Sequence, residues 1–273
     1  MGTALAVVHG RFGRASLYRL DKPLAPHAHR EGHLVFLVDG TPASIKVDGR
    51  TRALTSSLGA AVSPWQPHHF QPGETDDPAL FLTLYIKPMW FVEMSRTVGH
   101  GMRFGREVIV LDSVVGPLVE KIAETMMGEV TAPTVGRDLY DLTMASFEQS
   151  NHRLPDGHGN WPTLRDFRIR NAIRLMNERV ADVCALDTIA RESGLSRPHF
   201  YKLFRENVGL TPNMYLNTLR VERAIGRLTT TGDPITAIGL DLGFASQASF
   251  TRFFCNQAGL SPTDFRKVSR MAA

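Results

Sequence analysis

The chain has 273 residues, of which 43% are hydrophobic, and this is enough for two ordinary domains. No apolar run approaches the roughly eighteen residues of a membrane span, and the N-terminus lacks the basic segment and apolar core of a secretory signal. Residues 1–162 hold 15 Lys and Arg against 17 Asp and Glu, whereas residues 163–273 hold 16 against 10. This uneven charge is typical of one nucleic-acid-binding domain joined to a domain of another kind.

The first third of the chain is predicted to form strands. Short apolar segments are separated by turn signals, and two of them end at the Asp-Gly pairs 39–40 and 48–49, which are typical of hairpins. The predicted strands cover residues 34–38, 44–47, 52–55, 59–62 and 80–86. Their close spacing predicts a small antiparallel barrel or jelly roll.

Histidines are concentrated in this part. His27 and His29 are two positions apart, so on a strand both side chains point to one face. The pattern His27-x-His29-x3-His33-x6-Gly40 resembles the first cupin motif, with His33 where cupins usually have Glu. The resemblance implies a cupin-like sensor over about residues 10–90.

The second cupin motif is matched less well. Pro64 and His69 agree with it, but Gln66 replaces the usual glycine. The histidines have three possible roles: to hold a divalent metal, to line an organic-ligand pocket, or to pack structurally. The metal candidates are His27, His29, His33 and His69. The candidate ligand-pocket residues are His27, His29, His33, Trp65, His69 and Tyr85.

Two helices are predicted after the barrel. Residues 112–128 carry apolar side chains at helical spacing, and residues 134–150 repeat the pattern. These helices either cover the barrel or pair two subunits. Residues 151–161 are polar and turn-rich, which is typical of an interdomain linker.

One pattern occurs twice in the last third of the chain. Four residues recur fifty positions on: Phe200, Phe204, Gly209 and Pro212 return as Phe250, Phe254, Gly259 and Pro262. Each copy predicts a helix that ends at a glycine (Gly194 or Gly243) and a second helix capped by the hydroxyl of a serine (Ser196 or Ser246). This is the pattern of a helix-turn-helix. Residues 212–230 predict a connecting helix of about 28 Å.

The outer faces of the two second helices carry polar side chains suited to DNA. In the first copy they are Arg197, Tyr201, Lys202 and Arg205, and in the second Gln247, Ser249 and Arg252. Arg, Lys, Gln and Ser bond to base edges or phosphates. A solvated helix face is the alternative for a single copy, but two copies in tandem favour DNA binding.

The region 163–268 resembles the DNA-binding domain of the AraC/XylS family of bacterial transcription regulators. The resemblance is carried by Gly-Phe-x-Ser-Gln-x-Ser-Phe-x-Arg-x-Phe from Gly243, followed by Gly-Leu-Ser-Pro-x-x-Phe-Arg from Gly259. With the polar faces above, it implies that bases are read by Arg197, Pro198, Tyr201, Lys202, Gln247, Ala248, Ser249 and Arg252. Candidates for contact with the DNA backbone are Ser196, Arg205, Ser246 and Thr263.

We therefore expect an α+β chain in which a cupin-like antiparallel β-barrel with flanking helices precedes an all-α double helix-turn-helix domain. The expected segments are a sensor (1–110), a helical dimerisation segment (111–152), a linker (153–162) and a DNA-binding domain (163–273). The expected function is that of a transcription regulator, an activator by family habit, and not of an enzyme. Its expected partners are promoter DNA, a small-molecule effector, a second copy of the chain and RNA polymerase.

Two further expectations concern the surroundings of the protein. Cys184 and Cys255 form no disulfide framework, which fits a reducing cytoplasm, and no membrane partner is expected. No cofactor is expected apart from a divalent metal in the barrel. A metal-binding cupin that acts as a metal sensor or an enzyme, fused to a DNA-binding domain, is the alternative function.

Overall fold

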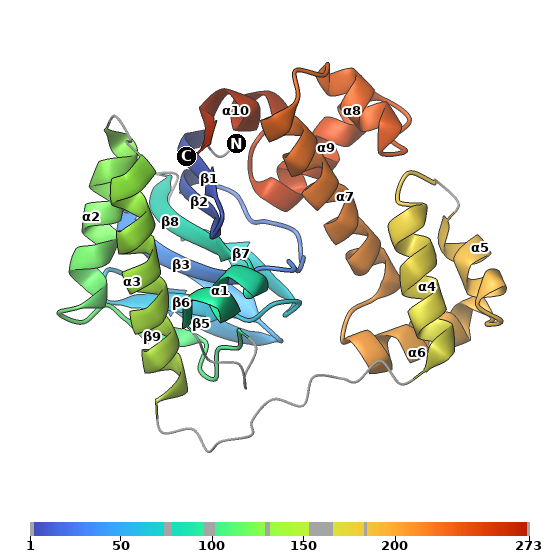
Figure 1. Cartoon of the computed structure of the whole chain (residues 1–273), viewed down its shortest axis with the longest axis horizontal. Coiled ribbons are helices and arrows are strands. Elements are labelled where there is room, and N and C mark those ends of the chain that lie inside the picture. Colours follow the sequence, from blue (N-terminus) through green and yellow to red (C-terminus); the bar gives the residue numbers. More distant parts are fainter. Residues whose placement is uncertain are drawn as a thin grey trace. The chain divides into compact units, whose positions relative to one another are not determined.

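The computed structural model describes residues 3–73, 78–95, 102–128, 132–152, 166–182 and 185–271. The chain divides into two compact units, one of Met1–Gly159 with Thr263–Ala273 and one of Asn160–Pro262. The first is built on antiparallel sheets and the second is helical, so the predicted fold class is confirmed (Figure 1). The predicted linker, residues 153–162, and Cys184 lie outside the described residues.

The N-terminal unit contains two sheets. The larger has the strand order β10-β1-β2-β8-β3-β6-β9, and the smaller has the order β5-β4-β7. The strands are β1 (Thr3–Gly10), β2 (Gly13–Leu20), β3 (Gly32–Asp39), β4 (Ala43–Val47), β5 (Arg50–Leu54), β6 (Leu58–Val62), β7 (His68–Gln71), β8 (Ala79–Ile86), β9 (Val108–Val110) and β10 (Ser269–Met271). All five predicted strands are confirmed, as β3, β4, β5, β6 and β8.

The large sheet is buried on both faces, and every residue of β8 is buried. One face carries Leu34, Leu82 and Leu84, which belong to one hydrophobic core with residues of α2 (Val115–Met127) and α3 (Ala132–Asn151). These two helices lie side by side over the sheet (Figure 1). Because side chains alternate along a strand, the other face carries Phe81, Thr83 and Tyr85. Phe81 lies 5.1 Å from Phe70 of the small sheet, measured between ring centres, so this face lines the inside of the barrel.

Both predicted helices after the barrel are confirmed, and α2 packs through the predicted stripe. Val115, Val119, Ile122 and Met126 are buried. Fully burying such a side chain contributes about 1.5–3 kcal/mol, so the stripe is enough to hold α2 on the sheet. A short helix, α1 (Pro88–Ser95), precedes this pair.

The last residues of the chain belong to the N-terminal unit. Strand β10 pairs in parallel with β1 at the edge of the large sheet, with Val7 opposite Ser269. Residues 263–273 therefore group with the barrel, whereas the sequence predicted one domain over 163–273. No local pattern predicts this pairing, because β10 has only three residues and its partner lies at the other end of the chain.

The C-terminal unit is a set of short helices. They are α4 (Phe167–Glu178), α5 (Ala185–Glu192), α6 (Arg197–Val208), α7 (Pro212–Thr230), α8 (Ile235–Asp241) and α9 (Gln247–Ala258), followed in the chain by α10 (Pro262–Val268). The repeated phenylalanines are fully buried: Phe200, Phe204, Phe250 and Phe254. No helix of the described residues is long and apolar enough to cross a membrane.

Candidate DNA-binding surface and buried histidine cluster

The first helix-turn-helix is formed by α5 and α6. Gly194 has φ +71°, a left-handed conformation that glycine adopts without steric cost, and the chain reverses there. Ser196 is the N-cap residue of α6, but its hydroxyl makes no cap hydrogen bond, so the predicted side-chain cap is wrong. Pro198 stands at the second position of the helix and has no N–H, which removes one of the two usual donors to the cap.

The second helix-turn-helix is formed by α8 and α9 and has a complete cap. The Ser249 N–H donates to the Ser246 hydroxyl at 3.2 Å, and the Ser246 N–H donates to the Ser249 hydroxyl at 3.1 Å. The Ser249 hydroxyl also donates to the Ser246 carbonyl at 2.7 Å. The Ser246 hydroxyl donates to the Ser249 hydroxyl at 3.3 Å as well. Ser249 therefore has a structural role in the helix start, and its proton and both lone pairs are used within the cap.

Most of the predicted DNA-contacting residues are exposed on their helices. On α6 and α9 the exposed base-reading candidates are Arg197, Pro198, Lys202, Gln247, Ala248 and Arg252, while Tyr201 and Ser249 are half-buried. The backbone candidates Ser196, Arg205, Ser246 and Thr263 are also exposed. Their contacts with DNA stay predictions. A shallow groove beside α6 is lined by Tyr201, Lys202, Arg205, Glu206 and Thr211.

Two of the candidates already have partners within the protein. The Arg197 guanidinium forms an ion pair with Asp187 at 2.9 Å, and the Gln247 side-chain oxygen accepts a hydrogen bond from the Thr236 hydroxyl. The Arg197–Asp187 pair is more than half exposed on both sides, so it is worth little and can be exchanged for a phosphate or base. His199 is also exposed in the first turn of α6, and it was not among the predicted residues although a full helical wheel places it on this surface.

Inside the barrel, four histidines lie together and all are at least nine-tenths buried. His27 and His29 come from the segment between β2 and β3, His33 from β3, and His68 from β7. The ring centres of His27 and His68 are 4.4 Å apart, and those of His27 and His29 are 4.7 Å apart. The rings of His29 and His33 are stacked at 5.5 Å.

The fourth member of this cluster is His68 and not its neighbour His69, which was the residue predicted from the sequence. His68 is 3% exposed, whereas its neighbour His69 is only partly buried and has no place in the group of possible metal ligands. Adjacent residues of a strand point to opposite faces, so only one of the two can face the interior. The backbone fixes which one, because His27 and His68 exchange two N–H···O=C hydrogen bonds of 2.9 Å.

The imidazoles of the cluster are neutral. Burial lowers the pKa of His27 to about 4 and that of His68 to about 3. Burial also holds the pKa of His29 and of His33 well below the ordinary value. The Nδ1 of His27 lies 2.6 Å from the Ala25 carbonyl, and that of His68 lies 2.9 Å from the Gln66 carbonyl. A carbonyl only accepts, so we assign the proton to Nδ1 and the lone pair to Nε2 in both rings.

Tyr85 connects the histidines to a buried arginine that the sequence analysis missed. Its ring centre lies 4.6 Å from that of His33 and 5.0 Å from that of His29. The Arg14 guanidinium carbon lies 3.7 Å from the same ring centre, and Arg14 is 8% exposed. A charged residue inside a strand of mostly small and apolar residues, Gly13–Leu20, was the signal available in the sequence.

Trp65, another candidate for the pocket, is tied to the cluster through its backbone. Its N–H donates to the His29 carbonyl at 2.6 Å. Its φ of +62° is unfavourable for a bulky residue, so the surrounding contacts must hold the conformation. This strained turn fixes the position of the segment that carries His29.

Comparison with known proteins identifies the family. A family model described as a helix-turn-helix domain matches residues 189–268. The regulatory protein SoxS of Escherichia coli is 33% identical over 98 residues, which cover 36% of this chain and 92% of SoxS. The chain belongs to the AraC/XylS family. Its helix-turn-helix domain makes it a DNA-binding transcription regulator of the AraC type.

Two family comparisons extend over most of the chain. The transcriptional activator RhaS of Escherichia fergusonii is 22% identical over 257 residues, which cover 91% of this chain and 90% of RhaS. The crystal structure of ToxT from Vibrio cholerae O395 covers 93% of this chain and 96% of its own, with a TM-score of 0.59 and 12% identity. A structure of ToxT with a bound unsaturated fatty acid has a TM-score of 0.55 at 15% identity. At these identities the ToxT likeness shows that the fold is shared.

Proposed function

We propose that this regulator is a sequence-specific activator of transcription whose N-terminal barrel binds a small-molecule effector. The observation that carries the proposal is that one compact unit holds two equivalent helices, α6 and α9, each with exposed polar side chains in its first two turns. In a helix-turn-helix this part of the second helix meets base edges in the major groove. The guanidinium of Arg252 suits guanine, and the carboxamide of Gln247 suits adenine.

The connecting helix supports simultaneous reading by α6 and α9. Helix α7 has 19 residues and is therefore about 28 Å long, comparable to one turn of duplex at roughly 34 Å. Buried residues occur along its whole length, from Tyr215 to Leu228, so α7 is part of the core of the unit and not a flexible tether. We propose that α6 and α9 enter successive major grooves on one side of the DNA.

The barrel interior supports effector binding. Apolar walls surround a few buried polar groups, among them Arg14, Tyr85 and the histidines, which is the usual make-up of a small-molecule site. In ToxT the same fold has been found with a fatty acid bound. The effector would shift the protein toward the DNA-binding conformation only if it binds that conformation more tightly. In this proposal the barrel binds its ligand without converting it.

Assembly is a further part of the proposal. We propose that two copies pair through α2 and α3, and the exposed apolar side chains of Val114 and Met127 at the two ends of α2 support this. Sedimentation of the purified protein should give twice the mass of one chain, and a monomer at micromolar concentration would contradict it. The activator would then recruit RNA polymerase to the promoter, in the cytoplasm.

Selection of bound sequences from a random pool of duplex DNA tests the proposal. The purified protein should enrich two short conserved blocks whose centres are about one helical turn apart, because each reading helix specifies one block. Enrichment of a single block would contradict reading by both helices. Failure to enrich any sequence, even at low salt, would overturn the assignment of a specific operator.

A further inference from the structure

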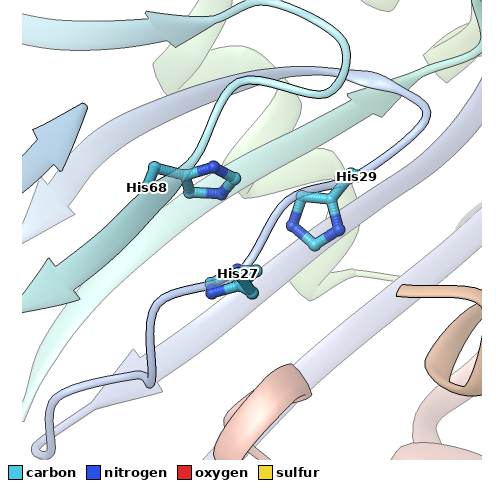
Figure 2. A group of neighbouring side chains, drawn as sticks. All are labelled: His27, His29 and His68. Atoms are coloured by element: carbon cyan, nitrogen blue, oxygen red, sulfur yellow. The ribbon is translucent and has the colours of Figure 1, made fainter. Parts of the chain in front are cut away.

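Three histidines of the buried cluster point ring nitrogens at one another. One ring nitrogen each from His27, His29 and His68 lies within 4.8 Å of the other two. Figure 2 shows the three rings gathered from two segments, the one that precedes β3 and the start of β7. The two backbone hydrogen bonds between His27 and His68 hold these segments together, so the rings meet on a rigid frame.

Two ring nitrogens of this group are buried and have no hydrogen-bond partner among the described residues. They are the Nε2 atoms of His29 and His68. Leaving a buried polar atom unpaired is unfavourable, so a folded protein usually supplies a partner. Packing of neutral rings explains why these side chains are buried, but it supplies no partner for these two nitrogens.

Hydrogen bonds to backbone carbonyls fix the orientation of two of the three rings. The Nδ1 atoms of His27 and His68 donate to the carbonyls of Ala25 and Gln66, which leaves the Nε2 lone pairs directed inward. Metal-binding histidines in proteins are commonly held in this way, because the second hydrogen bond sets both the tautomer and the direction of the lone pair.

We propose that His27, His29 and His68 bind one divalent transition-metal ion of the Zn²⁺ type. Three neutral nitrogen ligands suit Zn²⁺ and its neighbours better than Mg²⁺ or Ca²⁺, which prefer oxygen. Bonds of about 2.0–2.1 Å to a tetrahedral ion place ligand nitrogens about 3.4 Å apart, so the rings close inward from their present spacing. Three protein ligands leave one position open to water or to an anion.

Two further groups surround the three proposed ligands. The ring of His33 is stacked parallel to that of His29, with 3° between the planes, and its centre lies 4.6 Å from that of Tyr85 and 5.1 Å from that of His68. His33 is not one of the three residues whose nitrogens lie within 4.8 Å of one another. On the far side of Tyr85, Arg14 contributes a buried positive charge. That charge opposes any cation in the cluster, and an anionic group at the open position, such as hydroxide or a carboxylate, would offset this repulsion.

The metal site and the proposed regulation fail separately. Metal binding depends on barrel residues alone and is measured on the protein without DNA. Operator selection depends on α6 and α9 and is measured whatever the barrel holds. If the protein binds metal but selects no operator, the metal site is supported and the proposed regulation is contradicted. If it selects an operator but binds no metal, the regulation is supported and the metal site is contradicted.

The decisive experiment compares two neighbouring histidines. The untagged full-length chain is stripped with a chelator, supplied with Zn²⁺ and dialysed, and its metal content is measured. The wild type and His69→Ala should retain about one ion per chain. His68→Ala should bind Zn²⁺ at least about 100-fold more weakly, because loss of a direct ligand exceeds the effect of losing a supporting hydrogen bond. Since both variants remove one imidazole from the same strand, the comparison controls for nonspecific binding.

The visible spectrum of bound Co²⁺ identifies the ligand type, and with a second variant it tests the site even if His68→Ala fails to fold. Co²⁺ bound by imidazoles in a low-coordinate site gives strong visible absorption without the intense near-ultraviolet band of thiolates, so binding by Cys255 or Cys184 is recognised directly. His29→Gln, checked for folding by circular dichroism, should abolish this visible absorption. Equal retention of Zn²⁺ by the wild type and His68→Ala, equal loss in His68→Ala and His69→Ala, or a thiolate band would each overturn the proposal.

Discussion

Arg252 is the residue whose replacement gives the clearest test of base reading. Its side chain is exposed on α9, one turn after the capping box of Ser246 and Ser249, and its removal leaves the helix start intact. Arg252→Ala should weaken binding by about 1–3 kcal/mol for the selected operator and relax the preference at one base pair. Binding of a full panel of single-base operator variants is the measurement. Unchanged affinity for every sequence would remove Arg252 from the reading surface.

The histidine cluster was predicted only in part from the sequence. The pair His27 and His29 was found from its spacing, and His33 from its distance to them. His68 was missed in favour of His69, although alternation along the strand points His68 to the same face as the buried Phe70. Arg14 and Tyr85 meet because β2 and β8 are paired in one register, and no local pattern reveals that register.

His9 makes the stability of the protein depend on pH. Burial, together with the positive charges of Arg14 and Lys87, lowers the pKa of His9 to about 4. The unfolded chain binds a proton there near pH 6.5 and the folded chain does not, so the contribution is complete above pH 6.5 and is lost as pH falls toward 4. Between pH 7 and 5 the loss amounts to about 2 kcal/mol.

His9→Gln isolates this contribution from that of the other buried histidines, which act in the same direction. Urea unfolding of the metal-free wild type and the variant at pH 7 and pH 5 measures it. Between pH 7 and pH 5 the free energy of unfolding should fall by about 2 kcal/mol more in the wild type than in the variant. If both lose the same free energy, His9 is not held neutral in the folded state.

At the scale of elements, local signals carried most of the prediction. The helices of both helix-turn-helix motifs, the glycine turns and the strands with Asp-Gly hairpins all depend on residues close together in sequence, and they were found. Strands β1 and β10 were missed because their pairing is decided elsewhere: β1 adds to the edge of an existing sheet, and β10 adds to β1 from the far end of the chain. At Ser196 the side-chain cap was predicted from the serine alone, and the loss of one of its two usual donors at Pro198 was not considered.

Two glycines in equivalent turns should tolerate alanine differently. Gly194 and Gly243 both have left-handed backbones, with φ +71° and +84°. A Cβ at Gly194 meets no atom within 4 Å, whereas at Gly243 it would lie 2.0 Å from the carbonyl oxygen of Ala181. Gly194→Ala should therefore lower the free energy of unfolding only by the strain of alanine in a left-handed conformation, about 1–2 kcal/mol. Gly243→Ala should cost at least about 2 kcal/mol more, since the backbone must move as well.

Urea unfolding of the two variants measures this difference, and Gly194→Ala is the matched control for the conformational cost. Equal losses of stability would mean that the turn at Gly243 is not packed against Ala181. The same pair bears on function, because the turn before α9 positions the second reading helix. Gly243→Ala should weaken operator binding even under conditions in which the protein remains folded.

For the whole molecule, the uneven distribution of charge could be predicted from composition. The pairing of the C-terminal residues with the N-terminal unit could not. The excess of basic residues over 163–273 is a sum along the sequence and needs no structure. The return of residues 263–273 to the barrel unit depends on a free edge of the large sheet, which exists only after β1 has joined β2. One consequence is that a C-terminal fragment would lose the strand pairing of β10.

Because the basic excess lies in the C-terminal part, the salt dependence of DNA binding should respond to charges there and not to charges on the barrel. Arg205 is exposed on α6 beside the groove that Lys202 also lines, where a phosphate could approach. Arg205→Ala should weaken binding by a similar factor for every DNA sequence and reduce the slope of log K against log salt by about 1. Arg11→Ala is the control: Arg11 is highly exposed, has one weak ion pair with Glu93 at 3.5 Å, and lies in the N-terminal unit. Titrations at several salt concentrations should give Arg11→Ala the slope of the wild type. A loss of slope in Arg11→Ala as large as in Arg205→Ala would mean that the barrel also lies against the DNA backbone.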